Sequence, residues 1–215
     1  MRGTPLPDLI WAYLVAITLL TVSPGADTLL VVRNTGRGGV VDGCVTSLGI
    51  CLGLFVHATL SALGISVLLV ETAWAFTLLK WAGALYLIWL GLGSLRRAVA
   101  RVGPAAEAVA PPPGRRPLGI GQALREGLLS NLLNPKTALF YMALLPQFID
   151  PAGSAFQQSL WLAAVHFGVA MIWQCGLAWA VGRFRGLGSS ERLRRMLGTL
   201  TGGFFVALGA KLALS

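Results

Sequence analysis

Charged residues are scarce in this sequence, and acidic residues are the scarcest. Asp, Glu, Lys and Arg make up 12% of the 215 residues, with 8 acidic side chains against 17 basic ones. A soluble domain carries about twice that charged fraction, whereas 55% of this chain is hydrophobic. The composition therefore predicts an integral membrane protein and leaves no soluble domain to bind a nucleic acid.

Cysteine and histidine are also rare. Cys44, Cys51 and Cys175 lie in apolar surroundings without C-x-x-C or histidine spacing, which is typical of packing residues rather than of disulfides or metal ligands. His57 and His166 likewise lack acidic or cysteine neighbours at ligand spacing. We expect no metal site and no cofactor. No ATP-binding motif is present either, which argues against a primary pump in one chain.

The sequence does contain six apolar stretches, each long enough to cross about 30 Å of hydrocarbon as a helix. They lie at about 9–32, 44–69, 73–95, 122–146, 158–182 and 196–214. A stretch rich in Ala, Pro and Arg separates the third from the fourth and is typical of a linker. We therefore predict an all-α membrane protein with one three-helix segment at 1–97, a cytoplasmic linker at 98–120, and a second three-helix segment at 121–215.

The distribution of arginines predicts how these stretches are oriented in the membrane. They gather after the first span, throughout the linker, and between the fifth and sixth spans, whereas the other two connections hold little more than Glu71 and Asp150. Cytoplasmic connections carry the excess of positive charge. The pattern predicts that the arginine-rich connections are cytoplasmic and that both termini lie on the outer side of the membrane. Arg2, near the N-terminus, is the one residue that departs from this charge pattern.

Proline interrupts two of the spans, at Ser23-Pro24 and at Asn134-Pro135. Inside a helix proline removes a backbone hydrogen bond, but Ser or Asn followed by Pro is typical of a helix start, with the first residue as N-cap and proline in the first turn. We therefore predict that spans one and four are broken. Paired broken helices are the best sequence indication of a transporter binding site.

The two halves share further features in the same order, which favours an inverted repeat of three plus three helices. Spans two and five each hold one histidine, and spans three and six each hold a small-residue pair followed by an aromatic residue. The histidines are His57 in span two and His166 in span five. The other matching features are Ala82-Gly83 followed by Tyr86 in span three and Gly202-Gly203 followed by Phe205 in span six.

Two charged residues, Asp27 and Lys136, lie just beyond the predicted breaks. A carboxylate inside a membrane span costs about 2.5–3.5 kcal/mol on insertion scales and is usually functional. Asp27 could bind a substrate ammonium group, exchange a proton, or pair with Lys136. The N–H groups at each half-helix start suit a carboxylate. His57 and His166 could relay protons or could be hydrogen-bonded packing residues.

Two blocks of the sequence resemble the LysE/RhtB family of bacterial amino-acid exporters. The first runs from Ser23-Pro-Gly-Ala-Asp-Thr-Leu-Leu through Arg33-Asn34-x-x-Arg37-Gly38-Gly39. The second runs from Gly127-Leu-Leu-Ser-Asn-Leu-Leu-Asn-Pro-Lys-Thr to Asp150-Pro151. The resemblance covers nearly the whole chain apart from the linker. It implies a secondary exporter of amino acids or close derivatives in the bacterial cytoplasmic (inner) membrane, driven by the proton gradient.

The family's first motif carries over to Pro24, Gly25 and Asp27, and its second to the remaining matching positions. Those are Asn131, Asn134, Pro135 and Lys136. One departure is Ala26, which stands where the family commonly has a second proline. Together with Ser23, these residues form the expected substrate site, and Asp27, His57 and His166 are the expected proton-coupling residues.

The expected partners are an amino-acid or related small molecule, protons and the lipid bilayer. Gly49-x-x-x-Gly53 allows close helix approach and leaves a homodimer open. Export of a cation or another small metabolite is the first alternative. A membrane-embedded enzyme, with Asp27 and a histidine as acid and base, is the second, and a structural subunit is the third. The paired breaks favour transport, so we expect no enzyme.

Overall fold

The computed structural model describes residues 6–71 and 118–183 without gaps, together with single positions between 81 and 99 and between 196 and 213. Within those residues the chain is helical, with turns and no strands, as the sequence predicts. Most of the 98–120 linker, and the residues Ala82, Gly83, Tyr86 and Phe205 of the predicted repeat, lie outside the described part of the chain.

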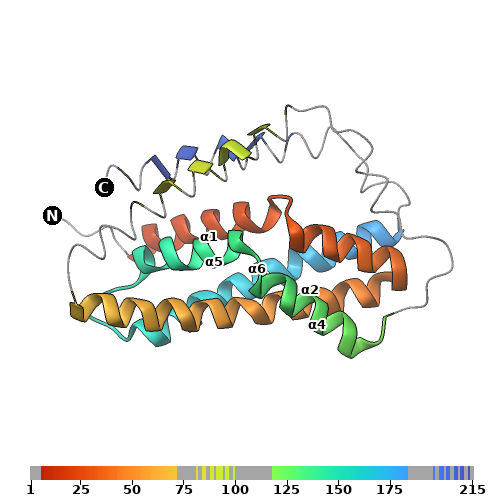
Figure 1. The fold of residues 1–215 in the computed structure, drawn as a ribbon, viewed down its shortest axis with the longest axis horizontal. Coiled ribbons are helices and arrows are strands. Elements are labelled where there is room, and N and C mark those ends of the chain that lie inside the picture. The colour runs from red at the N-terminus through yellow and green to blue at the C-terminus, as the bar shows by residue number, and fades with distance from the viewer. Residues whose placement is uncertain are drawn as a thin grey trace.

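The first half begins with α1 (Leu6–Val22) and α2 (Ala26–Glu71). Inside α2, Gly39 has φ 82° and ψ −172°, a backbone conformation that only glycine adopts readily. The chain reverses direction there, so the two parts of α2 run side by side in opposite directions (Figure 1). The predicted first and second spans are therefore separated by a glycine turn rather than by a loop.

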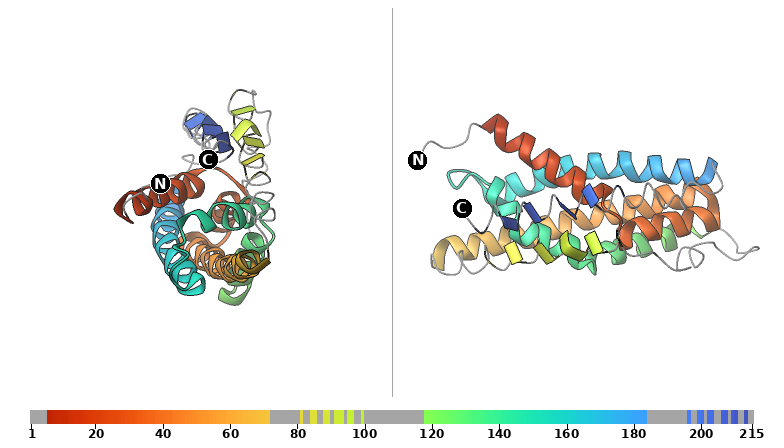
Figure 2. Two further views of the ribbon diagram at one scale, coloured as in Figure 1. Left: turned by 90° about the vertical axis from the view of Figure 1, so that its left-hand side faces the viewer. Right: turned by 90° about the horizontal axis from the view of Figure 1, so that it is seen from above.

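The second half contains α4 (Ile120–Leu132), α5 (Pro135–Ala143), the short 3-10 helix η2 (Leu145–Phe148) and α6 (Ala155–Arg183). In Figure 1, α1 and the first part of α2 follow one another along the long axis, while α4 and α5 follow one another in the opposite direction. Seen end-on in Figure 2, these helices and α6 surround a common centre. Both interruptions lie near the middle of the bundle.

Glycines bring α2 and α4 into backbone contact. A Cβ atom at Gly49 would collide with the carbonyl oxygen of Leu124, and one at Gly127 would collide with the carbonyl oxygen of Thr46. Gly53 faces the side chain of Asn131 in the same way. The Gly49-x-x-x-Gly53 pair thus packs against α4 of its own chain, as small residues do between membrane helices.

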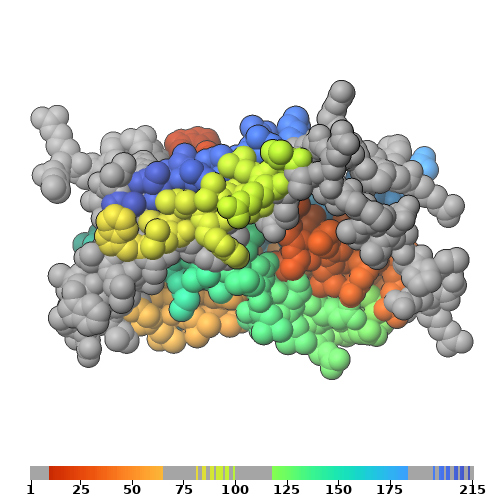
Figure 3. Space-filling model, turned by 45° about the horizontal axis from the view of Figure 1, so that its top comes forward, coloured from red at the N-terminus to blue at the C-terminus, as the bar shows by residue number. Residues whose placement is uncertain are grey.

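The described positions of the predicted third and sixth spans also pair with one another. Those between 81 and 99 lie beside those between 196 and 213 (Figure 3). A Cβ atom at Gly91 would lie 2.6 Å from the carbonyl oxygen of Gly202, and one at Gly209 would lie 2.7 Å from that of Ala84. Close glycine contacts therefore hold this helix pair together.

The outer surface of the bundle is apolar. Several large apolar side chains expose more than half of their accessible area, among them Trp11, Leu133, Ile172 and Trp179. Soluble proteins rarely carry large exposed apolar patches. By length and composition, Ala155–Arg183 could cross a membrane, and so could Ala26–Gly64, which includes the reversal at Gly39; Ile10–Val22 is an apolar helix of shorter length. Such a surface is suited to contact with lipid.

Candidate functional site

The first interruption separates α1 from α2. The backbone N–H of Ser23 donates to the carbonyl of Leu19 at 3.0 Å, so Ser23 completes the last turn of α1. The carbonyl of Gly25 accepts from the N–H of Leu29 at 3.0 Å, which makes Gly25 the N-cap of α2. The predicted N-cap role of Ser23 is therefore wrong, and Pro24 precedes the helix instead of lying in its first turn.

The second interruption separates α4 from α5, and its cap is the one that the sequence predicts. Asn134 is the N-cap of α5, Pro135 occupies the first helical position, and Oδ1 of Asn134 accepts from the backbone N–H of Lys136 at 3.0 Å. Asn134 is an extended residue with φ −81° and ψ 105°. The cap therefore uses one side-chain oxygen and leaves its amide nitrogen free to bond elsewhere.

Asp27, in the first turn of α2, receives hydrogen bonds from the second interruption. Its Oδ1 accepts from Oγ of Ser130 at 2.7 Å, and its Oδ2 accepts from Nδ2 of Asn131 at 3.0 Å and from Nδ2 of Asn134 at 2.9 Å. A carboxylate in a first helical turn is also favoured by the helix dipole. Three uncharged donors and a helix start therefore hold the Asp27 charge.

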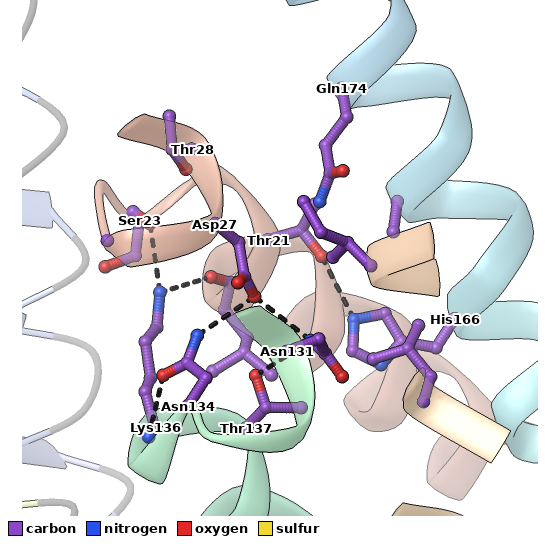
Figure 4. A pocket seen from close by; sticks show the side chains of 15 residues that line it. Thr21, Ser23, Asp27, Thr28, Asn131, Asn134, Lys136, Thr137, His166 and Gln174 are labelled. Atoms are coloured by element: carbon purple, nitrogen blue, oxygen red, sulfur yellow. Dashed lines mark hydrogen bonds between the residues drawn. The ribbon is translucent and has the colours of Figure 1, made fainter. Parts of the chain in front are cut away.

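Lys136 makes the reciprocal contact. Its Nζ donates to the carbonyl of Leu20 at 2.7 Å and to the carbonyl of Ser23 at 2.9 Å, both at the carboxyl end of α1. Those carbonyls lack helical partners, and the end of a helix attracts a cation. The lysine of one interruption thus binds the helix end of the other (Figure 4).

Each of the two histidines also forms a hydrogen bond with a residue in the other half of the chain. His57, on α2, places Nε2 3.0 Å from the carbonyl oxygen of Asn131. His166, on α6, places Nε2 3.1 Å from Oγ1 of Thr21 and Nδ1 3.0 Å from the hydroxyl of Tyr141. Each histidine therefore bonds the last turn before the interruption in the opposite half.

A cavity of about 30 Å³ lies between the two interruptions, which is room for about two water molecules. Its polar lining comes from both interruptions and from all five α-helices that flank them, and its apolar lining comes from Leu20, Ile50, Leu54 and Ala170. The polar residues are Thr21, Ser23, Asp27, Thr28, Asn131, Asn134, Lys136, Thr137, His166 and Gln174, with the backbone of Gly25. One anionic and one cationic side chain thus face a single cavity.

A second polar cluster joins α2 to α4 away from the cavity. Arg33 forms an ion pair with Glu126 at 2.6 Å, and Nδ2 of the fully buried Asn34 donates to Glu126 at 3.2 Å and to Oγ1 of Thr46 at 3.0 Å. Arg33 lies between the first interruption and the Gly39 turn. The cluster therefore fastens the two halves together at the end of the bundle where the chain reverses.

The sequence model of the family described as LysE type translocator matches residues 18–215. The chain belongs to the LysE type translocator family. The match confirms the resemblance found from the two sequence blocks, and it makes this LysE translocator a membrane transport protein rather than an enzyme.

The similarity to known proteins covers almost the whole chain of this LysE translocator. The chain is 32% identical to the uncharacterized membrane protein YrhP of Bacillus subtilis over 208 residues, covering 95% of this chain and 98% of that protein. It is 32% identical to a homoserine/homoserine lactone efflux protein of Salmonella typhi, covering 94% and 95% of the two chains. It is 29% identical to a leucine efflux protein of Salmonella choleraesuis, covering 94% and 93%. No solved structure matches the chain.

The cavity of this LysE translocator includes most, but not all, of the residues expected from the sequence. Ser23, Gly25, Asp27, Asn131, Asn134, Lys136 and His166 line it, whereas Pro24, Pro135 and His57 do not. Pro24 and Pro135 instead lie at the two interruptions, and His57 bonds the carbonyl of Asn131 beside the second interruption. Within the described residues, no group of three or more His, Cys, Asp or Glu side chains could hold a metal ion.

Sequence reasoning missed Ser130, the closest donor to Asp27, and Gln174, which lines the cavity from α6. Gln174 is 6% exposed, and its Oε1 has no hydrogen-bond partner in the described residues. Burying an unpartnered amide oxygen costs about 1–3 kcal/mol. A single glutamine within an otherwise apolar stretch was the signal that could have identified it.

Proposed function

We propose that this LysE translocator exports amino acids or close derivatives across the bacterial cytoplasmic membrane, and that the cargo binds in the cavity between the two helix interruptions. The observation that carries the proposal is the presence of Asp27 and Lys136 on one cavity wall, each held by uncharged groups. A zwitterion carries both complementary charges. The similarity to proteins named for homoserine/homoserine lactone efflux and for leucine efflux supports the same class of cargo.

The architecture that we propose is six membrane-spanning helices in an inverted repeat of three plus three, with helices one and four discontinuous. The two half-helices that begin at Ala26 and Pro135 run in opposite directions (Figure 1). The crossed histidine contacts, from His57 to Asn131 and from His166 to Thr21, support a pseudo-twofold relation between the halves. The repeats would span 1–97 and 121–215, on either side of the cytoplasmic linker.

The orientation that we propose follows from charge. The Gly39 turn, the start of α4 and the end of α6 lie at one end of the bundle (Figure 1). Arg33 and Arg37 precede that turn, and Arg183 is the last residue of α6. Positive residues favour the cytoplasmic side, so this end would face the cytoplasm and both termini would lie outside.

Binding requires the cavity to widen, because about 30 Å³ is far less than the 300 Å³ or more of typical small-molecule sites. The cargo's ammonium group takes the place of Asp27's amide donors. Its carboxylate engages Lys136 and the N–H groups at the start of α5. Separation of the halves at the Arg33–Glu126 end admits cargo from the cytoplasm, and rocking of the halves then exposes it outward.

Protons enter this scheme at Asp27. Protonation of that carboxylate from outside removes the charge that holds the ammonium group, so proton uptake promotes cargo release. His166 is the second candidate for a proton-coupling role, because it bonds Thr21 and Tyr141 and lines the cavity. His57 bonds a backbone carbonyl outside the cavity lining, which suits a supporting role.

The test uses purified protein in lipid vesicles loaded with a panel of labelled amino acids, with and without an imposed proton gradient. The proposal predicts efflux of at least one amino acid or derivative, accelerated by the gradient. Efflux of inorganic cations alone would favour the cation alternative, and release of a chemically altered product would favour the enzyme. Absence of both efflux and ligand-induced thermal stabilisation across the panel would favour a structural subunit.

A further inference from the structure

Gln174 is a cavity residue with a buried hydrogen-bond acceptor that the described part of the protein does not use. It is 6% exposed, it lies on α6, and its Oε1 has no partner in the described residues. Figure 4 shows its carboxamide directed into the cavity, toward Thr21 and Asp27. An apolar helix that buries an unpartnered amide at a cavity surface presents that amide to whatever occupies the cavity.

The other polar α6 side chain in the cavity is already bonded, and the second buried cavity oxygen without a partner in the described residues, Oδ1 of Asn131, belongs to α4. Three residues of α6 line the cavity at a spacing of four: His166, Ala170 and Gln174. His166 uses both ring nitrogens on Thr21 and Tyr141, and Ala170 has no polar side-chain atom. Gln174 is therefore the α6 side chain that can both donate to and accept from a bound molecule.

Gln174 belongs to α6, whereas the charged groups suited to the main chain of an amino acid, Asp27 and Lys136, come from α2 and α5. Ile50, Leu54 and Ala170 line the cavity beside the charged wall formed by Asp27 and Lys136. A zwitterion whose charges engage Asp27 and Lys136 directs its side chain toward the remaining wall. That side chain then meets a surface that combines Ile50, Leu54 and Ala170 with the Gln174 amide.

We propose that Gln174 binds a hydrogen-bonding group on the cargo's side chain, so that the site selects short polar amino acids or their derivatives, such as hydroxyl or lactone compounds, over aliphatic ones of the same size. The inference rests on the proposed function. An aliphatic cargo would fill the wall but leave the Gln174 amide unpartnered. A site built to bond a polar group discriminates strongly against an analogue that lacks it.

The experiment compares homoserine with norvaline, which has a methyl group in place of the hydroxyl, by counterflow in vesicles containing the purified protein. The wild type is expected to favour homoserine by about tenfold or more. Gln174→Leu is expected to bring the ratio near one, mainly by slowing homoserine. Gln157→Leu, the same change at an exposed position of α6, is the control and keeps the wild-type ratio.

Other outcomes are equally decisive. Equal transport of the two compounds by the wild type, transport of other amino acids but of neither of these, or an unchanged ratio in Gln174→Leu would overturn the role of Gln174 while leaving amino-acid export intact. If Gln174→Leu abolishes all transport, Gln174→Asn, which retracts the amide by one methylene group, must lower the ratio. An unchanged ratio there overturns the inference. Transport of no amino acid by the wild type overturns both proposals.

Discussion

Nδ2 of Asn134 lies 2.9 Å from Oδ2 of Asp27, while Oδ1 of the same side chain accepts from the backbone N–H of Lys136 at 3.0 Å. One amide therefore caps α5 and reaches the first turn of α2. The two helix interruptions are thus joined through a single side chain, although 107 residues separate Asn134 from Asp27. A ligand that displaces this bond at Asp27 also loosens the position of α5.

The two roles of Asn134 can be separated by substitution. Asn134→Ala removes both the cap and the donor and should destabilise the protein by about 1 kcal/mol or more. Asn134→Ser keeps a capping oxygen but is too short to reach Asp27, so it should recover most of the thermal stability without recovering transport. Thermal unfolding and vesicle efflux measured on both variants check this. Wild-type efflux by Asn134→Ser would show that the bond to Asp27 is dispensable.

The close packing of α2 on α4 predicts a sharp contrast among glycines. Gly49→Ala and Gly127→Ala place a Cβ atom against the carbonyls of Leu124 and Thr46, so each should destabilise the protein by about 1–3 kcal/mol. Gly168→Ala and Gly176→Ala, on α6, meet open space and should be neutral or slightly stabilising. Thermal unfolding in detergent measures all four. Equal effects at the two pairs would argue against the backbone contact.

His57 is expected to be a supporting residue. Its Nε2 lies 3.0 Å from the carbonyl oxygen of Asn131, and a glutamine amide can donate to the same carbonyl. His57→Gln should therefore retain proton-coupled efflux within about threefold, whereas His57→Leu, which leaves that carbonyl with the backbone N–H of Asn134 as its remaining donor, should lower thermal stability by about 0.5–1.5 kcal/mol. A loss of the pH dependence of efflux in His57→Gln would instead assign the residue to proton coupling.

The Arg33–Glu126 pair predicts an effect on transport that is larger than its effect on stability. Both side chains are partly exposed, at 52% and 25%, and exposed ion pairs contribute only about 0–1 kcal/mol. If the pair closes the cytoplasmic end, Glu126→Arg should alter the rate of efflux while thermal stability changes little. The exchanged double variant, Arg33→Glu with Glu126→Arg, should recover part of the rate, and no recovery would argue against a direct role for the pair.

Sequence reasoning reached the helical class, the family and the helix cap at Asn134, because each depends on local chemistry. Asn134 followed by Pro135 specifies a helix start wherever the chain folds. The start of the helix after the first interruption was predicted two residues too early, because Ser23 and Gly25 are both residue types that suit an N-cap. The backbone bond from Ser23 to Leu19 decides in favour of Gly25.

The partners of the charged residues could not be read from the sequence. Asp27 bonds Ser130, Asn131 and Asn134 because α2 packs on α4, which brings together residues more than 100 positions apart. The sequence offered a direct pair between Asp27 and Lys136 as one alternative, but it did not suggest the two carbonyl acceptors that Lys136 has at the end of α1. The reversal between the first two spans was expected among residues 33–43, and the structure places it at Gly39, with φ 82°.

The most direct test of the cavity as the cargo site is amino-acid counterflow in vesicles by Asp27→Asn beside the wild type, with Asp150→Asn as an exposed control. Counterflow needs no proton gradient, so it measures binding and exchange apart from coupling. The account predicts that Asp27→Asn inserts and folds but loses exchange by about a hundredfold or more, while Asp150→Asn exchanges normally. Wild-type exchange by Asp27→Asn would contradict a cargo site at this carboxylate.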